Sequence, residues 1–386
     1  MAITGDQRLL KRINRMALVR LVRGRPGLSR AELAADTGLT KSTVSLLVQE
    51  LIDEGWLREE EVLVTGAIGR RPTPLRLDDR RLALIGAELG VGILAVVATN
   101  LAGEVIAKAN QTVASELSAN DTLSLLCQML EDVVREVREA DRVVLGVGVG
   151  TPGSVQESSG ILAVAPNLGW RDIPVRDWIL KSLHAAALGD IPVFVQNDAD
   201  VAALGEVEFC SIGVGDPLLF LSLGVGVGAG VVVGGRLLLG RRGFAGEVGH
   251  IQLQSDGPTC SCGRRGCAEA FFGLQVMLNA LQSAKLELLD VSRSEEFVQS
   301  LLRTAGQRLG VLMHNLWTTL DPGLIVLGGP SCKLGPSFID AARETFQRLA
   351  NEAGLEVPSV VQARYGELMI PVGAAALVLH KYLQPI

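Results

Sequence analysis

A group of metal-binding residue types lies within residues 243–271, which read GFAGEVGHIQLQSDGPTCSCGRRGCAEAF. His250 is one of only four histidines, and Cys260, Cys262 and Cys267 follow it in the spacing H-x9-C-x-C-x4-C. Three thiolates and one imidazole complete the tetrahedral shell of a structural Zn2+, which leaves no open position for hydrolysis. The metal would order a glycine-rich loop that cannot bury a core of its own. The alternative is three buried free cysteines beside an unrelated histidine.

Carboxylates lie near this motif and again at the end of an apolar strand. Glu247 and Glu269 flank the motif, so a bound metal would hold both in fixed positions. The apolar strand runs into Asn197 and Asp198, and ligands of α/β proteins bind at such strand ends. Asp198 is therefore a candidate general base or acceptor of hydroxyl hydrogen bonds. The alternative is that Asn197 or Asp198 only caps the helix that we expect over 201–206.

A glycine-rich segment, GVGVG over 224–228, separates two apolar stretches within 218–239 that we expect to be strands. A loop of this kind exposes backbone amides and can cradle a phosphate. It can equally be only a tight turn between two strands, because glycine alone is weak evidence for a ligand.

The N-terminal residues differ in charge from the rest of the chain. Residues 1–81 carry 15 Lys and Arg against 11 Asp and Glu, whereas the remainder carries 21 against 31. Helical periodicity over 8–24 and two capped segments, 30–36 and 41–54, predict three helices. The short turn with glycine between the last two helices is typical of a helix-turn-helix, whose second helix enters the major groove of DNA.

The residues expected to contact DNA lie at helix starts and in a loop over 65–74 between two short strands, which together indicate a winged helix-turn-helix. Short hydroxyl side chains can approach base edges, and lysine and arginine can reach guanine, phosphates or the minor groove. The candidates are Ser29, Thr40, Lys41, Ser42, Thr43, Ser45, Arg70 and Arg71. The alternative is a small helical packing module with a solvated basic face.

From residue 82 onward the pattern predicts an α/β body. We expect three strands over 82–113, a helix over 122–139, a buried strand over 143–150, a loop over 165–170, and later a strand over 324–327 and a last helix over 373–382. The predicted units are a DNA-binding domain (1–81), a first lobe (82–200) and a second lobe with the metal motif (201–386), whose last helix can return to the first lobe.

Composition narrows the class of protein. A chain of 386 residues is too long for one ordinary domain, and 48% apolar residues can form large cores. No uninterrupted apolar run reaches the length of about 18 residues that a membrane span needs, and the N-terminus lacks the apolar region of a signal peptide. Six cysteines in so long a chain do not indicate a disulfide framework. We therefore expect a cytoplasmic protein without a membrane partner.

The motif A-G-E-x-G-H followed by C-x-C-G-x-x-G-C-x-E resembles the signature of the ROK family (repressors, open reading frames, kinases). Further matches, over about 83–386, follow the family's order: Thr151-Pro152-Gly153, Asn197-Asp198-Ala199, the 224–230 loop and the segment from Asp321-Pro322 to Gly328-Gly329. The added N-terminal domain resembles the repressor branch, of the xylose-repressor and N-acetylglucosamine-repressor kind. The resemblance implies a two-lobed, actin/hexokinase-like (ribonuclease H-like) α/β body with a sugar in the cleft.

The resemblance also implies which residues contact the sugar. A carboxylate can accept from two hydroxyls at once, and His250 can bind the metal through one ring nitrogen while the other faces the sugar. In kinases of the family, the residue that corresponds to Asp198 is the catalytic base. The implied sugar contacts are Asn167, Asn197, Asp198, Glu247, His250 and Glu269.

Two segments depart from the family's kinase pattern. The kinase motif D-x-G-G-T reads Glu88-Leu89-Gly90-Val91-Gly92, and G-T-G-x-G reads GVGVG over 224–228. Both have lost a hydroxyl side chain, and phosphoryl transfer depends on groups that position and stabilise the transferred phosphoryl. We therefore expect no kinase activity, and we expect Asp198 to bind the sugar rather than to act as a base.

The sequence thus predicts a sugar-responsive DNA-binding regulator, a repressor of sugar uptake or catabolism genes, whose operator affinity changes when a monosaccharide such as xylose or glucose binds. The expected cofactor is structural Zn2+, and the expected assembly is a homodimer, or a tetramer, that reads a near-palindromic operator. One alternative is an ATP-dependent, glucokinase-like sugar kinase with an added DNA-binding domain. Another is a constitutive or activating DNA-binding protein whose body only dimerises.

Overall fold

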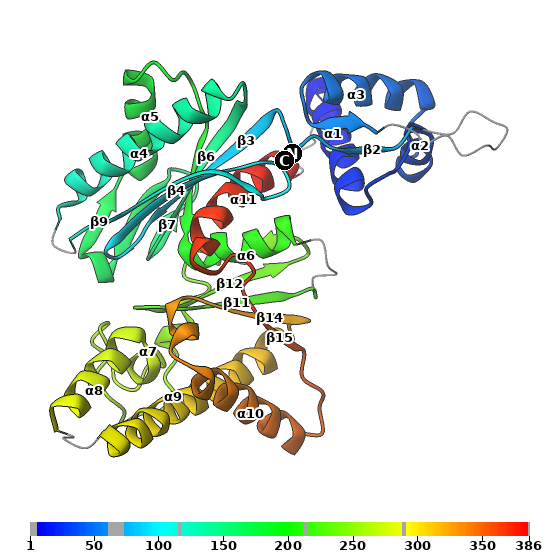
Figure 1. Cartoon of the computed structure of the whole chain (residues 1–386). Helices are drawn as coiled ribbons and strands as arrows, with labels where there is room; N and C mark the ends of the chain where they lie inside the picture. Colours follow the sequence, from blue (N-terminus) through cyan, green and yellow to red (C-terminus); the bar gives the residue numbers. More distant parts are fainter. Residues whose placement is uncertain (1–5, 61–72, 115–116, 211–214, 288–290, 385–386) are drawn as a thin grey trace.

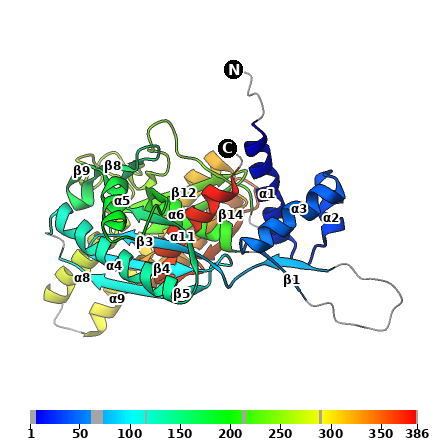
Figure 2. The same cartoon turned by 90° about the horizontal axis from the view of Figure 1, so that it is seen from above.

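The structure, a computed structural model, describes residues 6–60, 73–114, 117–210, 215–287 and 291–384. A helical head at the N-terminus stands beside a body of two lobes, each built on its own five-stranded sheet (Figure 1 and Figure 2). This is the α/β architecture that the sequence predicts. In the part of the chain that is described, no helix is both long and apolar enough to cross a bilayer.

The head consists of α1 (Gln7–Gly24), α2 (Arg30–Thr37) and α3 (Lys41–Asp53), followed by the antiparallel strands β1 (Leu57–Glu59) and β2 (Leu75–Leu77). The helices begin within one residue of the predicted positions because their caps are local. Ser29 and Glu32 form the expected capping box, and Thr40 accepts a hydrogen bond from the amide of Thr43. The tip of the wing, with Arg70 and Arg71, falls outside the described residues.

The sheet of the first lobe has the strand order β10-β6-β3-β4-β5. α4 (Ala119–Glu139) and α5 (Val175–Ala185) pack against one face. Glycine and valine alternate in β6, so the two faces of this strand differ. Val147 and Val149 point to the core beneath α4 and α5, whereas Gly148 points to α11. The strands are β3 (Leu82–Leu89), β4 (Ile93–Thr99), β5 (Val105–Thr112), β6 (Val143–Thr151) and β10 (Val193–Asn197).

Two helices, α6 (Asp198–Phe209) and α11 (Met369–Leu383), lie between the sheets (Figure 1). α11 is the last helix, and it returns to the first lobe, where the Tyr382 hydroxyl donates to the carbonyl of Leu145 over 3.0 Å. A Cβ at Gly148 would clash with the carbonyl oxygen of Ala374 in α11, so this close packing requires glycine. Both helices begin earlier than the sequence indicates, by three and four residues.

The sheet of the second lobe has the order β13-β12-β11-β14-β15. Helices cover the face that is turned away from α6, namely α7 (Glu269–Phe272), α8 (Leu274–Glu287), α9 (Val291–Leu320) and α10 (Pro336–Glu352). The strands are β11 (Leu218–Leu223), β12 (Val227–Val233), β13 (Arg236–Leu237), β14 (Leu324–Gly328) and β15 (Ser359–Gln362).

A three-stranded antiparallel sheet, β7-β8-β9, was not predicted. Its strands are β7 (Ser154–Gln156), β8 (Ile161–Ala165) and β9 (Trp170–Ile173). We expected only a loop over 165–170, but a single 3-10 turn, Pro166–Leu168, joins β8 to β9. These strands are short and partly polar, so they give little periodic signal. The small sheet matters because its turn carries Asn167.

Candidate ligand site and metal centre

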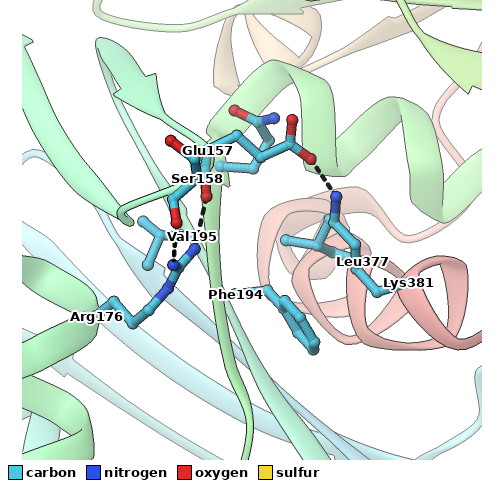
Figure 3. Close-up of a pocket in the computed structure, with 8 residues that line it drawn as sticks. Glu157, Ser158, Arg176, Phe194, Val195, Leu377 and Lys381 are labelled. Carbon is cyan, nitrogen blue, oxygen red and sulfur yellow. Dashed lines mark hydrogen bonds and ion pairs between the residues drawn. The ribbon is translucent and has the colours of Figure 1, made fainter. Parts of the chain in front are cut away.

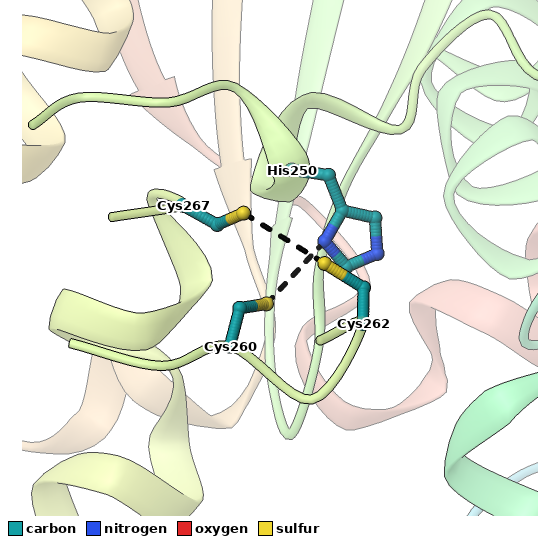
Figure 4. A group of neighbouring side chains, drawn as sticks. All are labelled: His250, Cys260, Cys262 and Cys267. Atoms are coloured by element: carbon teal, nitrogen blue, oxygen red, sulfur yellow. Dashed lines mark hydrogen bonds between the residues drawn. The ribbon is translucent and has the colours of Figure 1, made fainter. Parts of the chain in front are cut away.

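The four predicted metal ligands converge on one point (Figure 4). Their ligand atoms all lie within 4.8 Å of one another. Cys260 Sγ lies 3.6 Å from His250 Nδ1, and Cys262 Sγ lies 3.8 Å from Cys267 Sγ. Tetrahedral Zn–S bonds of about 2.3 Å place two ligands about 3.8 Å apart, so the residues fit a closed zinc site.

The segment 254–267 of the loop around this cluster has little apolar packing of its own, since Cys260 and Cys267 are its only buried side chains. Tight backbone turns hold it, with Cys260 N donating to the Arg264 carbonyl over 2.8 Å. Gly266 takes a positive φ of 73°, and a Cβ there would clash with the carbonyl of Gln254. A loop with so few apolar contacts is the kind that a bound metal stabilises.

A cavity of about 390 Å³ lies beside the metal cluster and is lined by both lobes. Its size suits a small organic ligand. All six residues that the resemblance implies as sugar contacts line it: Asn167, Asn197, Asp198, Glu247, His250 and Glu269. The cavity opens where β3, β6 and β10 end, which is the edge that the sequence analysis expects to bind a ligand.

His250 connects the metal cluster with the cavity. It belongs to the 3-10 turn Val248–His250, and its Nδ1 faces the thiol of Cys260. Its Nε2 lies 3.9 Å from Glu247 Oε2, and both residues line the cavity. A single imidazole thus faces the thiols with one nitrogen and the ligand cavity with the other.

Asn197 lines the cavity, but its side chain is already engaged. Its Oδ1 accepts hydrogen bonds from the amides of Ala199 and Asp200, over 2.9 and 3.3 Å, which caps α6. Its Nδ2 donates to the carbonyl of Gly153 over 3.0 Å. The capping interpretation of this residue is therefore confirmed, and the cap fixes the position of the next residue, Asp198.

Asp198 is the first residue of α6 and lies in the cavity wall. Burial and, to a lesser degree, the charge of Glu247 raise its pKa to about 6, although the amide of Ala199 donates to Oδ1 over 2.8 Å and opposes this rise. The carboxyl is therefore largely ionised at neutral pH and can accept hydrogen bonds from hydroxyl groups.

The glycine-rich segment is a tight turn between β11 and β12, in which the Gly224 amide donates to the Gly226 carbonyl over 3.0 Å. The next amide, that of Val227, donates to Glu269 Oε2 over 3.1 Å. The other oxygen of Glu269 accepts from the Ser261 hydroxyl over 2.8 Å. The Val227 amide, which was a candidate to donate a hydrogen bond to a phosphate, is thus already bonded to a carboxylate of the protein.

Three residues that no sequence motif indicates also line the cavity, namely Glu88, Phe244 and Arg264. Glu88 was noted only as a departure from the kinase pattern. Its position near the end of β3, beside the ends of β6 and β10, was a usable signal. Phe244 and Arg264 lie in loops whose course cannot be read from sequence.

A second, smaller cavity of about 290 Å³ is lined by residues of β10 and α11 (Figure 3). Its charged groups are engaged within the protein. Arg176 donates to the carbonyls of Glu157 and Ser158, both over 2.6 Å, and Lys381 forms an ion pair with Glu157. None of the site residues predicted from the sequence lines this cavity.

The candidate DNA contacts of the head divide into three groups. Thr40, Lys41, Ser42 and Ser45 are exposed at the start of α3, and Thr43 is partly exposed. Ser29 is only 3% exposed, and its hydroxyl donates to Glu32 over 2.7 Å within the capping box. Arg70 and Arg71 lie in the segment that is not described. Of the predicted DNA contacts, the residues at the start of α3 are therefore the ones whose side chains are exposed to solvent in the described structure.

Comparison with known proteins assigns the chain to a family. A model described as the ROK family matches residues 84–381, and a model of the IclR helix-turn-helix domain matches residues 16–61. The chain belongs to the ROK family. A ROK body thus follows an N-terminal helix-turn-helix, as the sequence motifs predict.

The relatives of this ROK protein are of two kinds. A xylose repressor of Caldicellulosiruptor bescii is 28% identical over 399 residues, which cover 98% of both chains. A glucokinase of Halalkalibacterium halodurans is 32% identical over 232 residues, which cover 54% of this chain and 68% of the glucokinase. The similarity to the repressor includes the head, whereas the similarity to the glucokinase is partial.

The fold as a whole also has a solved counterpart. The crystal structure of a ROK family transcriptional regulator, a homologue of the Escherichia coli MLC protein, matches with a TM-score of 0.80 over 97% of both chains. The two sequences are 23% identical, so this comparison supports the fold alone.

Proposed function

We propose that this protein is a DNA-binding repressor whose operator affinity changes when a monosaccharide, such as xylose or glucose, binds in the cavity between the lobes. A relative similar over nearly the whole chain is named a xylose repressor, and the head matches a helix-turn-helix model. The structural observation that carries the proposal is α6, because this helix begins at the cavity and ends against the head.

The two ends of α6 support such a coupling. At its start, Asp198 lines the cavity. Near its end, the buried Glu208 accepts a hydrogen bond from His380 Nδ1 of α11 over 2.6 Å and forms an ion pair with Arg23 of α1. Burial by itself would raise the pKa of Glu208, but the His380 hydrogen bond and the Arg23 charge hold it below its usual value.

A sugar that binds Asp198 can therefore alter DNA binding if it favours one arrangement of α6 over another. The rigid helix would transmit that difference to Arg23 and hence to the head. A buried ion pair resists small displacements because a separated partner would remain buried without its counter-charge. We propose Glu208 as the point at which the body controls the head.

The sugar would be held by the six residues that the resemblance implies. Asp198, Glu247 and Glu269 would accept hydrogen bonds from hydroxyls, and His250 Nε2 would face the sugar. Asn167 can donate, while Asn197 contributes mainly by fixing Asp198, since its amide is engaged in the helix cap. This assignment is supported by the convergence of all six side chains on one cavity.

We propose Zn2+ as the metal held by His250, Cys260, Cys262 and Cys267, whose separations suit a tetrahedral ion. When bound, the ion supplies a fixed positive charge that orients the imidazole and orders the loop. Through Ser261, the same loop holds Glu269. The metal therefore acts on sugar binding by positioning residues, without taking part in a reaction.

On the DNA side, we assign residues 1–81 to the DNA-binding domain, and 82–200 and 201–386 to the two lobes, with α11 packed between their sheets. Lys41, Ser42, Thr43 and Ser45 would enter the major groove, and Arg70 and Arg71 of the wing would contact phosphates or the minor groove. A homodimer, or a tetramer, would present two heads to a near-palindromic operator in the cytoplasm.

We propose that the protein does not phosphorylate its sugar. Both segments that would hold the phosphates lack the hydroxyls of the kinase pattern, and the Val227 amide is engaged by Glu269. The full-length relative is named a repressor, and the glucokinase matches about half of the chain. An ADP-release assay with xylose and glucose should give the same rate for the wild type and for Asp198→Asn.

The proposal is tested by thermal unfolding of the zinc-loaded protein with a panel of neutral monosaccharides. A ligand at 100 times its Kd stabilises the folded state by about 2.7 kcal/mol, so at least one sugar should raise the melting temperature by several degrees. A panel without any shift would contradict the proposed sugar site and favour a body that only dimerises.

A further inference from the structure

Glu88 is a buried carboxyl in the wall of the cavity. It lies near the end of β3, where it pairs with Gly150 of β6, and its side chain is only 9% exposed. Gly86, two residues earlier, faces α11, so Glu88 projects from the same face of the sheet toward the space between the lobes. Glu88 therefore lies near the first residues of both α6 and α11, and Met369 and Ile370 at the start of α11 line the same cavity.

The surroundings of Glu88 within the protein do not explain its burial. Burial and, to a lesser degree, the charge of the neighbouring Asp198 raise its pKa to about 8, and neither a cation nor a hydrogen bond offsets these two effects among the described residues. The carboxyl oxygens of Glu88 are not among the fully enclosed unpaired atoms, so they open onto the cavity, where a hydrogen-bond partner would stabilise them. A ligand in the cavity is the partner within reach.

The chemistry of Glu88 complements that of its neighbours. At neutral pH it is mostly a carboxylic acid, which can donate a hydrogen bond, whereas Asp198 mainly accepts. A sugar hydroxyl both donates and accepts. One hydroxyl between the two carboxyls could therefore donate to Asp198 and accept from Glu88, so that all three groups would be paired.

The charges around the cavity disfavour an anionic ligand. Glu88, Asp198, Glu247 and Glu269 line it, and Arg264 of the metal loop is the only lysine or arginine in its described lining. A phosphate beside Asp198 would bring two negative charges together in a cavity whose described lining also holds the carboxyls of Glu247 and Glu269. The cost of placing like charges close together in a buried site disfavours such a ligand.

We propose that Glu88 is a further ligand contact that donates a hydrogen bond to the sugar hydroxyl held by Asp198. It thereby restricts the effector to sugars in which this hydroxyl is free rather than phosphorylated. The inference rests on the proposed function and adds the chemical class of the effector and the residue that selects it.

The groups that face Glu88 set what a change of pH does. Its charged neighbour is Asp198 of α6. The start of α11 contributes the uncharged Ile370, and the start of β4 contributes the uncharged Ile93. The wall of the other lobe contains Glu247, Glu269 and His250. Asp198, with a pKa of about 6, is already largely ionised at pH 7, whereas Glu88, with a pKa of about 8, still gains charge above this pH. Sugar binding should therefore weaken as pH rises through about 8.

The experiment is isothermal titration of the full-length, zinc-loaded protein with D-xylose and D-glucose, and separately with glucose 6-phosphate. Glu88→Gln keeps the size and a donor but cannot ionise, Glu88→Ala removes both, and Glu136→Gln on the exposed side of α4 is the control. Operator binding without sugar, and thermal unfolding, verify that each variant is folded.

We expect Glu88→Ala to bind the sugar about tenfold more weakly and Glu88→Gln to stay within about threefold of the wild type. The affinity of the wild type should fall by about tenfold from pH 7 to pH 9, while that of Glu88→Gln should change little. Glucose 6-phosphate should give no detectable binding to the wild type.

Three results would overturn the inference: wild-type affinity in Glu88→Ala, equal losses in both variants, or binding of glucose 6-phosphate as tight as that of glucose. If the wild type bound no sugar at all, the proposed function itself would fail, and this inference with it. Sugar binding that does not depend on Glu88 would leave the proposed function standing and remove only the role of this residue.

Discussion

Glu269 joins three parts of the ligand site through one carboxylate. One oxygen accepts from the Val227 amide in the glycine turn, and the other accepts from Ser261 in the metal loop. The residue also lines the cavity. A change in the metal loop should therefore reach the sugar through Glu269 and through His250, which faces both the thiols and the cavity.

Replacement of one thiol tests this connection. Cys262→Ser should lose the bound zinc, and its sugar affinity should fall by about 10–100-fold because both residues lose their support. Zinc content by elemental analysis and sugar affinity by calorimetry measure the two effects. Cys332→Ser, outside the cluster, is the matched control. A variant that has lost its zinc yet binds sugar like the wild type would show that the metal does not organise the site.

At the scale of elements, α6 spans the distance between the sugar site and the head, and α11 packs beside it. Glu208 contacts both α11, through His380, and α1, through Arg23. This three-way contact involves residues far apart in the sequence. The account therefore predicts that Glu208 controls coupling between the two sites without taking part in either.

Glu208→Gln should separate sugar binding from DNA binding. The sugar affinity should stay within about threefold of the wild type, while the ratio of operator Kd values with and without sugar should fall from the typical range of about 5–150 toward one. Fluorescence anisotropy with labelled operator, with Glu136→Gln as control, measures this ratio. An unchanged ratio in Glu208→Gln would mean that the signal takes another route.

The elements differ in how well the sequence predicts them. The helices of the head were placed within one residue because the Ser29 and Thr40 caps are local signals. α6 and α11 were predicted too short, because both are buried on nearly all sides and so lack amphipathic periodicity. The strands β7, β8, β9 and β15 were missed, since they have only three to five residues each and form by pairing with neighbouring strands.

The candidate site shows the same division. The candidate metal ligands could be named from their spacing and the candidate sugar contacts because the family resemblance points to them, and the structure brings all of them together. Glu88 was assigned no role in binding, because its position at the end of a strand becomes decisive only when the fold places β3 beside the start of α6. The contact between Glu208 and Arg23 spans two domains and leaves no periodic or motif signal.

At the scale of the whole molecule, the chain combines a basic head with an acidic body that encloses a cavity lined by four carboxyl groups. The repressor similarity extends over both parts, and the glucokinase similarity covers about half of the chain. A body that senses a sugar must contact the head through an element that also reaches the cavity. α6 does so, with Asp198 at the cavity and Glu208 against Arg23 of α1. The central claim is therefore the coupling between the cavity and DNA.

The most direct test is an operator-binding titration of the full-length, zinc-loaded protein with and without a neutral monosaccharide identified by thermal shift. We predict that a saturating sugar changes the operator Kd by about five-fold or more, and that Asp198→Asn abolishes this change while its affinity without sugar is retained. An operator Kd that is the same with and without the bound sugar would contradict the account.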